Sequence, residues 1–86
     1  MTRAQLREHY IGLTRYIVAS MIPADSHEEI EVSAAWNSGQ LKVNLSVPDE
    51  FRGMLIGRSG HMVRSIRQVL NAASLDVPGG VELDIV

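Results

Sequence analysis

Apolar side chains in the first quarter of the chain recur every three or four residues, as they do along one face of an α-helix. This face consists of Leu6, Tyr10, Leu13, Ile17 and Met21. The pattern predicts a helix over residues 6–22, which Pro23 ends because proline cannot continue a helix. Ile11, Val18 and Ile22 widen the apolar face. This width indicates either a broad contact with the core or, in part, a surface that meets another protein.

The spacing of apolar residues changes to two after residue 28, which is typical of a half-buried β-strand. On the first predicted strand, residues 29–36, the apolar positions are Ile30, Val32, Ala34 and Trp36. After a turn at residues 37–40, the alternation resumes with Leu41, Val43, Leu45 and Val47. The two segments together predict a β-hairpin over residues 28–47.

Residues 48–75 have the pattern of two helices joined by a glycine-bounded turn. Pro48 and the two carboxylates after it suit the first turn of a helix, where the helix dipole favours negative charge. This helix should run to about Ile56, where Gly57-Arg58-Ser59-Gly60 interrupts it. A second amphipathic helix follows, with its apolar side at Val63, Ile66, Leu70 and Ala73.

A loop and one more alternating segment complete the chain. Pro78-Gly79-Gly80 forms the loop, and the alternation after it predicts a last strand over residues 81–86. The order αββααβ, with one apolar side to each strand, predicts an α+β fold: a three-stranded sheet with helices packed on one face. We expect one domain over residues 1–86, made of an N-terminal helix and connection (1–27), the hairpin (28–47), the helical pair (48–75) and the final strand (81–86).

The composition fits a single small globular domain. The chain has 86 residues, of which 45% are hydrophobic and 21% charged, and it contains no cysteine. Its three histidines, His9, His27 and His61, have no metal-ligand spacing, and His9 and His27 have no neighbouring catalytic group. We therefore expect no metal, no cofactor and no catalytic residue, so the protein should not be an enzyme. The absence of a long apolar run predicts a soluble, cytoplasmic protein that does not bind a membrane.

Gly57 and Gly60 bound the turn between the two predicted helices. Glycine permits a sharp turn, including one with positive φ, and leaves no Cβ between the backbone and a ligand. The N–H groups at the start of the second helix favour anions, so a phosphodiester backbone could lie there. The alternative is a plain tight turn, because two glycines at this spacing are common in helical hairpins.

Positive charge gathers around the same turn, although the whole chain has a formal net charge of −2. Residues 51–75 contain no acidic residue and four arginines, Arg52, Arg58, Arg64 and Arg67. Arg64 and Arg67 share the polar side of the second predicted helix. The segment is therefore either an electropositive binding surface or a solvated, arginine-rich helix face.

Residues 55–66 resemble the signature of a KH domain, which has an apolar pair, a GxxG turn and apolar residues three and six positions after the second glycine. In this chain these are Leu55-Ile56, Gly57 to Gly60, Val63 and Ile66. The order of the elements resembles the type II arrangement of KH folds. Nearly the whole chain is similar to the small bacterial single-KH RNA-binding proteins of the KhpA family, most closely over residues 47–60 and 66–73.

The resemblance implies a type II KH-like fold with a mixed sheet, and a groove for about four single-stranded nucleotides. The nucleic-acid-binding residues that it implies are Gly57, Arg58, Ser59, Gly60, Ile56, Val63 and Arg64. The four turn residues would hold phosphates, with Ile56 and Val63 at the wall of the groove and Val43 and Leu45 as a possible floor. The turn holds one basic residue, beside a neutral serine, where the family commonly has two cationic or strongly polar residues, which predicts modest affinity.

The resemblance further implies an RNA chaperone or post-transcriptional regulator linked to cell shape. Its expected partners are single-stranded RNA, a second copy in a homodimer, and a KhpB (Jag-like) protein. A nucleotide-binding enzyme is a weaker interpretation, because His61-Met62 stands where a P-loop has its lysine and hydroxyl residue. In another interpretation the chain is a protein-interaction module, whose wide first helix and acidic residues 28–31 bind protein while the groove binds nucleic acid weakly or not at all.

Overall fold

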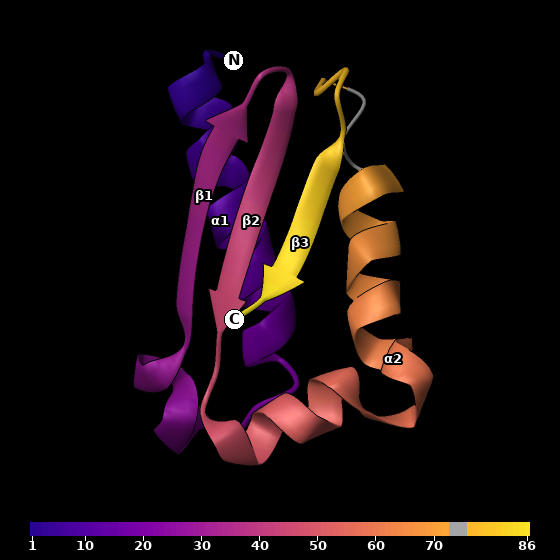
Figure 1. Cartoon of the computed structure of the whole chain (residues 1–86). Helices are drawn as coiled ribbons and strands as arrows, with labels where there is room; N and C mark the ends of the chain where they lie inside the picture. The colour runs from indigo at the N-terminus through magenta and orange to yellow at the C-terminus, as the bar shows by residue number, and fades with distance from the viewer. Residues whose placement is uncertain (73–75) are drawn as a thin grey trace.

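The computed structural model describes residues 1–72 and 76–86, without the side chains of Arg58 and Ser59. Its elements are α1 (Arg3–Ala19), the 3-10 helix η1 (Ala24–Glu29), β1 (Glu31–Asn37), β2 (Gln40–Ser46), α2 (Asp49–Ala72) and β3 (Val81–Ile85) (Figure 1). This arrangement confirms the predicted α+β class. The predicted end of the helical segment at residue 75, with Ala73, lies outside the described residues.

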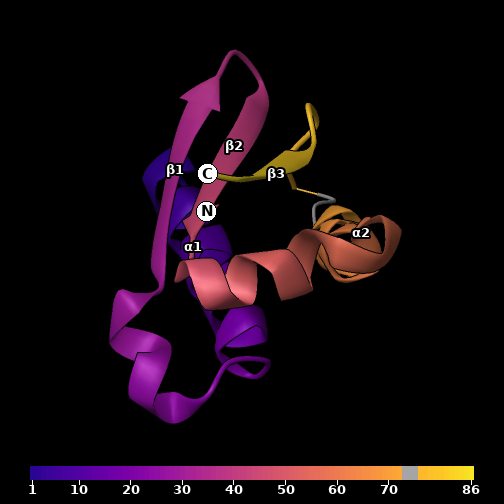
Figure 2. The same ribbon diagram turned by 60° about the horizontal axis from the view of Figure 1, so that its bottom comes forward.

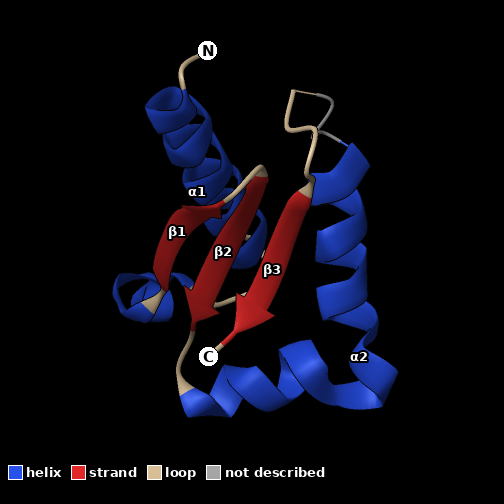
Figure 3. Cartoon of the chain, turned by 45° about the horizontal axis from the view of Figure 1, so that its top comes forward, coloured by secondary structure: helices blue, strands red, loops and turns tan. Residues whose placement is uncertain are grey.

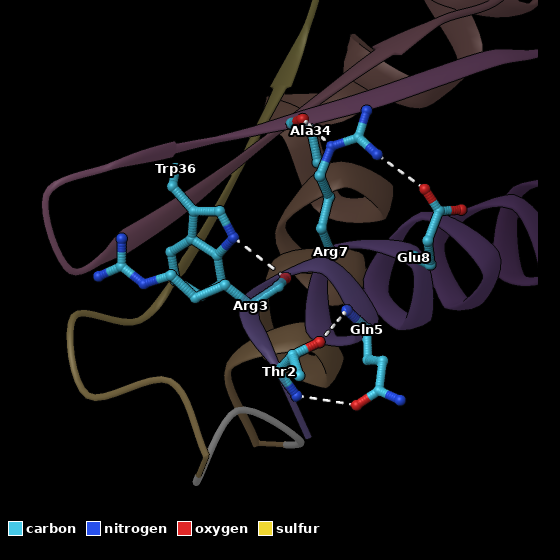
Figure 4. Close-up of polar contacts among 7 residues, drawn as sticks. All are labelled: Thr2, Arg3, Gln5, Arg7, Glu8, Ala34 and Trp36. Carbon is cyan, nitrogen blue, oxygen red and sulfur yellow. Dashed lines mark hydrogen bonds and ion pairs between the residues drawn. The ribbon is translucent and has the colours of Figure 1, made fainter.

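α1 begins with a capping box. The Thr2 hydroxyl accepts a hydrogen bond from the Gln5 backbone N–H at 3.1 Å, and the Thr2 N–H donates to Gln5 Oε1 at 2.8 Å (Figure 4). Both contacts satisfy backbone donors near the start of the helix. The buried residues of α1 are Leu6, Tyr10, Thr14 and Val18. Leu13, Ile17 and Met21, which we expected on this face, are only partly buried beside it, because polar Thr14 occupies its centre.

The helix ends at Ala19, earlier than the predicted Ile22, and is followed by η1, which the sequence did not predict. Val18 and Ile22 are nevertheless buried, and Ile11 packs against the core. The wide apolar face of this region is therefore mainly a core face. Because η1 occupies Ala24–Glu29, the first strand begins at Glu31, later than expected.

The three strands form one mixed sheet in the order β1-β2-β3. β1 and β2 are antiparallel, from the pair Glu31 and Ser46 to the pair Asn37 and Gln40. β2 and β3 are parallel, with Val43 opposite Leu83 at the centre of the register. The predicted hairpin and final strand are both present.

The sheet has a buried face and a polar face. Leu41, Val43 and Leu45 of β2 are completely buried. On the opposite face, Lys42 Nζ lies 4.0 Å from Glu82 Oε2 of β3. Figure 1 shows α1 behind the sheet and α2 around the end of the sheet and beside β3. In the described part of the chain, no helix is both long and apolar enough to cross a lipid bilayer.

α2 is one continuous element that changes direction sharply, as Figures 2 and 3 show. We call residues 49–57 its first arm and residues 61–72 its second arm. The first arm crosses below the sheet, and the second arm runs beside β3. The two helices expected over residues 48–75 are therefore the two arms of a single bent helix.

The loop before β3 packs against the hairpin turn. A Cβ atom on Gly79 would lie 2.3 Å from the carbonyl oxygen of Gly39, so the two backbones touch. Gly80 has a φ of +81° and its carbonyl accepts a hydrogen bond from the Leu41 N–H at 3.1 Å. This contact fixes the start of β3 against β2.

Candidate nucleic-acid interface

The bend of α2 depends on Gly60. This residue has a φ of +70°, in the left-handed region. A residue with a side chain in this conformation lowers the stability of the fold by about 1–2 kcal/mol. Gly57 lies outside that region, and a Cβ atom there would meet nothing within 4 Å. The backbone thus requires glycine at Gly60 alone, although the sequence suggested that either glycine could need positive φ.

Gly53 and Gly57 are spaced four residues apart, on the exposed side of the first arm. Leu55, between them in sequence, is completely buried, so the two glycines point away from the core. A Cβ atom at Gly53 would also meet nothing within 4 Å. The main chain of the first arm is consequently open to approach along this side.

A pocket lies on each side of the two glycines. The first has a volume of about 420 Å³ and is lined by Gly53, Met54, Gly57, His61 and Met62. The second has a volume of about 540 Å³ and is lined by Asp49, Arg52, Gly53, Ile56 and Gly57. Gly53 and Gly57 line both pockets. A nucleic-acid strand bound over these glycines would therefore have space for its bases on either side.

The structure brings the predicted site residues together around the bend. Ile56 is 44% exposed and lines the second pocket. Val63 is 7% exposed, and its Cγ1 lies 3.4 Å from the position that a Cβ on Gly60 would take. Arg64 is exposed on the second arm. The side chains of Arg58 and Ser59 lie outside the described part of the chain.

Other expectations about this site need correction. Val43 and Leu45 are completely buried in the core, so they cannot form an accessible floor for bases. Gly53, which lines both pockets, and Met54, which lines the first, were not among the expected site residues. The four-residue interval between Gly53 and Gly57 was the available signal, because residues at that interval share a helix face.

The arginines of α2 differ in their surroundings. Arg52 and Asp49 both line the second pocket, so its lining contains one basic and one acidic residue. Arg67 donates from Nε and Nη2 to the carbonyl oxygen of Leu83, at 3.0 and 2.9 Å. Arg67 therefore connects the second arm to β3, a role that its place in a cluster of arginines did not predict.

Trp36 and Tyr10 lie away from the bend and stabilise the fold. Figure 4 shows Trp36 beside Arg3, whose guanidinium carbon is 4.7 Å from the ring centroid and whose carbonyl accepts from Trp36 Nε1 at 3.2 Å. Burial, together with the hydrogen bond to Asp76, raises the pKa of Tyr10 to about 12. Neither pocket is lined by Phe, Tyr or Trp, and the first is lined by the imidazole of His61, so base contacts there would be apolar, hydrogen-bonding or made with this one ring. The described residues contain no group of three or more potential metal-binding side chains of His, Asp or Glu.

Two comparisons with known proteins agree on the kind of domain. The family model described as "KhpA/KhpB, KH domain" matches residues 13–85. Among solved structures, the chain is similar to Era from Aquifex aeolicus, crystallised as a single-residue variant bound to GDP.AlF4−. The TM-score is 0.65 at 22% sequence identity, over 93% of this chain and 31% of the Era chain. This likeness shows the fold alone, which is a type II KH fold.

Proposed function

Because the chain belongs to the KhpA/KhpB family of KH domains, we propose that it binds single-stranded RNA across the bend of α2. KH domains are nucleic-acid-binding modules, so membership of the family supports RNA binding. The observation that carries the proposed location is the open backbone at Gly53 and Gly57, directly before Gly60. In our proposal this surface contacts the RNA backbone.

The chemistry of the bend suits a phosphodiester. At Gly57 the lack of a Cβ atom lets a phosphate oxygen approach the main chain. The second arm begins just after Gly60, and the positive end of its dipole favours negative charge near the bend. We assign Arg58, Ser59 and Arg64 to contacts with neighbouring phosphates, because a charged or hydroxyl donor strengthens such contacts.

The bases would occupy the space beside the glycines. Ile56 offers an apolar surface, and the pocket that it lines also contains Arg52, a hydrogen-bond donor. A groove of the KH type accommodates about four nucleotides, which limits the number of contacts. We therefore propose modest affinity and a shallow salt dependence. The logarithm of the binding constant should fall by about 0.7 per logarithmic unit of salt concentration for each phosphate contact on a single strand.

Weak binding by a single groove gives a reason for partners. Two linked binding modules raise the effective affinity without any new contact at either site. We propose that the chain acts as a homodimer or with a KhpB (Jag-like) protein, as an RNA chaperone or post-transcriptional regulator with an influence on cell shape. Family membership supports this wider role, which goes beyond the geometry of the bend.

The proposal is tested by fluorescence anisotropy with a labelled, degenerate single-stranded RNA at two salt concentrations. The double variant Arg58→Asp/Ser59→Asp adds two negative charges at the bend and should abolish binding by repelling phosphates. Gly57→Leu should weaken binding at least tenfold, because its side chain would project into the space proposed for the RNA. Circular dichroism should show that both variants remain folded.

Gly12→Leu is the matched control for Gly57→Leu. Gly12 also lies within a helix, and a Cβ atom there would meet nothing within 4 Å, but it belongs to α1. RNA affinity should be unchanged in this control. Equal affinity of the wild type, Gly57→Leu and the double variant would contradict the proposed site.

A protein-interaction module is the second candidate, favoured by the exposed acidic side chains of Glu28, Glu29 and Glu31. The packing of α1 against the core removes much of the apolar surface on which that interpretation relied. Failure of the folded wild type to bind RNA, alone or with a partner, would favour this second candidate.

A further inference from the structure

The contact between Arg67 and Leu83 uses up the hydrogen-bonding capacity of a carbonyl at the sheet edge. A backbone carbonyl oxygen has two lone pairs. Arg67 Nε and Nη2 donate to the carbonyl of Leu83 at 3.0 and 2.9 Å, so both lone pairs have a donor. A guanidinium has five N–H groups, which leaves three for another acceptor.

The backbone carbonyl of Leu83 points away from β2, toward the outer edge of the sheet. β3 is an edge strand, parallel to β2. The N–H of Leu41 donates to Gly80 and the N–H of Val86 donates to Leu45, so the even-numbered residues of this segment bond to β2. The backbone groups of the alternate residues, Leu83 among them, therefore point to the outer edge, toward the second arm of α2.

This edge is connected to the bend by a short series of contacts. A Cβ on Gly60 would touch Val63, and Arg67 follows Val63 by one helical turn on the same side of the second arm. Arg67 then reaches Leu83. An RNA strand that crosses the bend and continues toward β3 would meet a surface with N–H donors and no available acceptor at Leu83.

We infer that Arg67 determines base specificity, by making this part of the RNA site select bases with carbonyl acceptors over bases with amino donors. The inference rests on the proposed function. Uracil presents the carbonyl oxygen O4 where cytosine presents an amino group, and the two rings have the same size. Uracil can accept from Arg67, whereas the cytosine amino group would face a carbonyl whose lone pairs are already occupied.

The test compares two labelled hexanucleotide RNAs, one of uridine only and one of cytidine only, by anisotropy. The wild type should bind the uridine RNA about tenfold more tightly, the size of effect that one well-formed base contact provides. Arg67→Met keeps the aliphatic stem but removes the donors and releases the Leu83 carbonyl. Its preference for uridine should fall to about twofold or less, through weaker uridine binding, stronger cytidine binding or both.

Arg64→Met is the matched control, because Arg64 is exposed on the same arm and we assign it to phosphate contacts. It should weaken binding of both RNAs to the same extent and leave the preference for uridine intact. Arg67→Lys, which keeps the positive charge without the forked donors, should give an intermediate preference and checks the conclusion if Arg67→Met is unstable.

The possible outcomes separate the inference from the function on which it rests. Binding of both RNAs by the wild type without a preference for uridine, or with a preference that folded Arg67→Met and Arg67→Lys retain in full, would overturn the inference alone. Binding of neither RNA by the folded wild type would contradict the proposed function and the inference with it.

Discussion

The hydroxyl of Tyr10 donates a hydrogen bond to Oδ1 of Asp76 at 3.0 Å, across 66 residues of sequence. Tyr10 is completely buried in α1, while Asp76 is exposed in the loop between α2 and β3. The contact joins the first helix of the fold to the segment that leads into its last strand. Among the described groups, Tyr10 is the only one with a resolved pKa shift, and it lies far from the proposed RNA site.

Tyr10→Phe should lower the free energy of unfolding by about 1 kcal/mol, the net contribution of one hydrogen bond. It should also change the response to alkaline pH. The pKa of Tyr10 is about 12 in the folded protein, against about 10 in an unfolded chain, so folding favours the neutral hydroxyl. This contribution to stability is fully present below about pH 10 and is lost as the pH rises toward 12.

Urea denaturation of the wild type and Tyr10→Phe between pH 8 and 12 measures both effects. Tyr16 is present in both proteins and therefore cancels in the comparison. The wild type should lose more stability than Tyr10→Phe above pH 10. Parallel losses in the two proteins would show that the Tyr10 hydroxyl has no such linkage.

Gly79→Ala should destabilise the fold by about 1–3 kcal/mol, as forced overpacking does. The new Cβ would lie 2.3 Å from the carbonyl oxygen of Gly39, and neither backbone can move without disturbing the hairpin turn or the start of β3. The midpoint of urea denaturation measures the change. Gly53→Ala, where the added Cβ meets nothing, is the control and should not be destabilised; equal midpoints for the two variants would contradict the close packing.

Gly57→Ala and Gly60→Ala should change stability in opposite directions. Alanine at Gly57 fits the helix without a clash and should stabilise it by about 0.5–1 kcal/mol. Alanine at Gly60 must adopt the left-handed φ and should cost about 1–2 kcal/mol. Melting temperatures compare the pair directly, and destabilisation of both proteins to the same degree would mean that Gly57 also serves the turn.

Thr14→Val should stabilise the protein by about 1 kcal/mol. Thr14 is completely buried and, within the described structure, its Oγ1 has no hydrogen-bond partner, which is costly in an apolar environment. Valine has nearly the same shape without the hydroxyl. Thermal denaturation of Thr14→Val and Thr14→Ser separates the hydroxyl from the methyl group, and a less stable valine variant would show that the hydroxyl makes a useful contact.

The strands could be predicted from sequence because their apolar residues alternate without interruption. Leu41, Val43 and Leu45 are all completely buried, as the pattern required. The buried face of α1 was only partly predictable, because an interpretation based on apolar residues passes over Thr14. The helix η1 has no apolar period at all, so nothing in its composition distinguished it from a loop.

The candidate site divides in the same way. The GxxG motif predicted the position of the bend, because the backbone at Gly60 has a positive φ that favours glycine. The contact between Arg67 and Leu83 could not be predicted, since it depends on the placement of the second arm beside an edge strand. The open backbone at Gly53 could be predicted only by knowing that the first arm turns this residue toward solvent.

The most direct test of the central claim is a two-dimensional ¹H–¹⁵N NMR titration of the wild type with single-stranded RNA. We expect the amide signals of Gly53, Gly57 and Gly60 to shift most, while those of Gly12 in α1 and Gly39 in the hairpin turn stay in place. Shifts concentrated at Gly12 or Gly39, or along the polar face of the sheet, with the signals at the bend unchanged, would contradict the claim that RNA binds across the bend of α2.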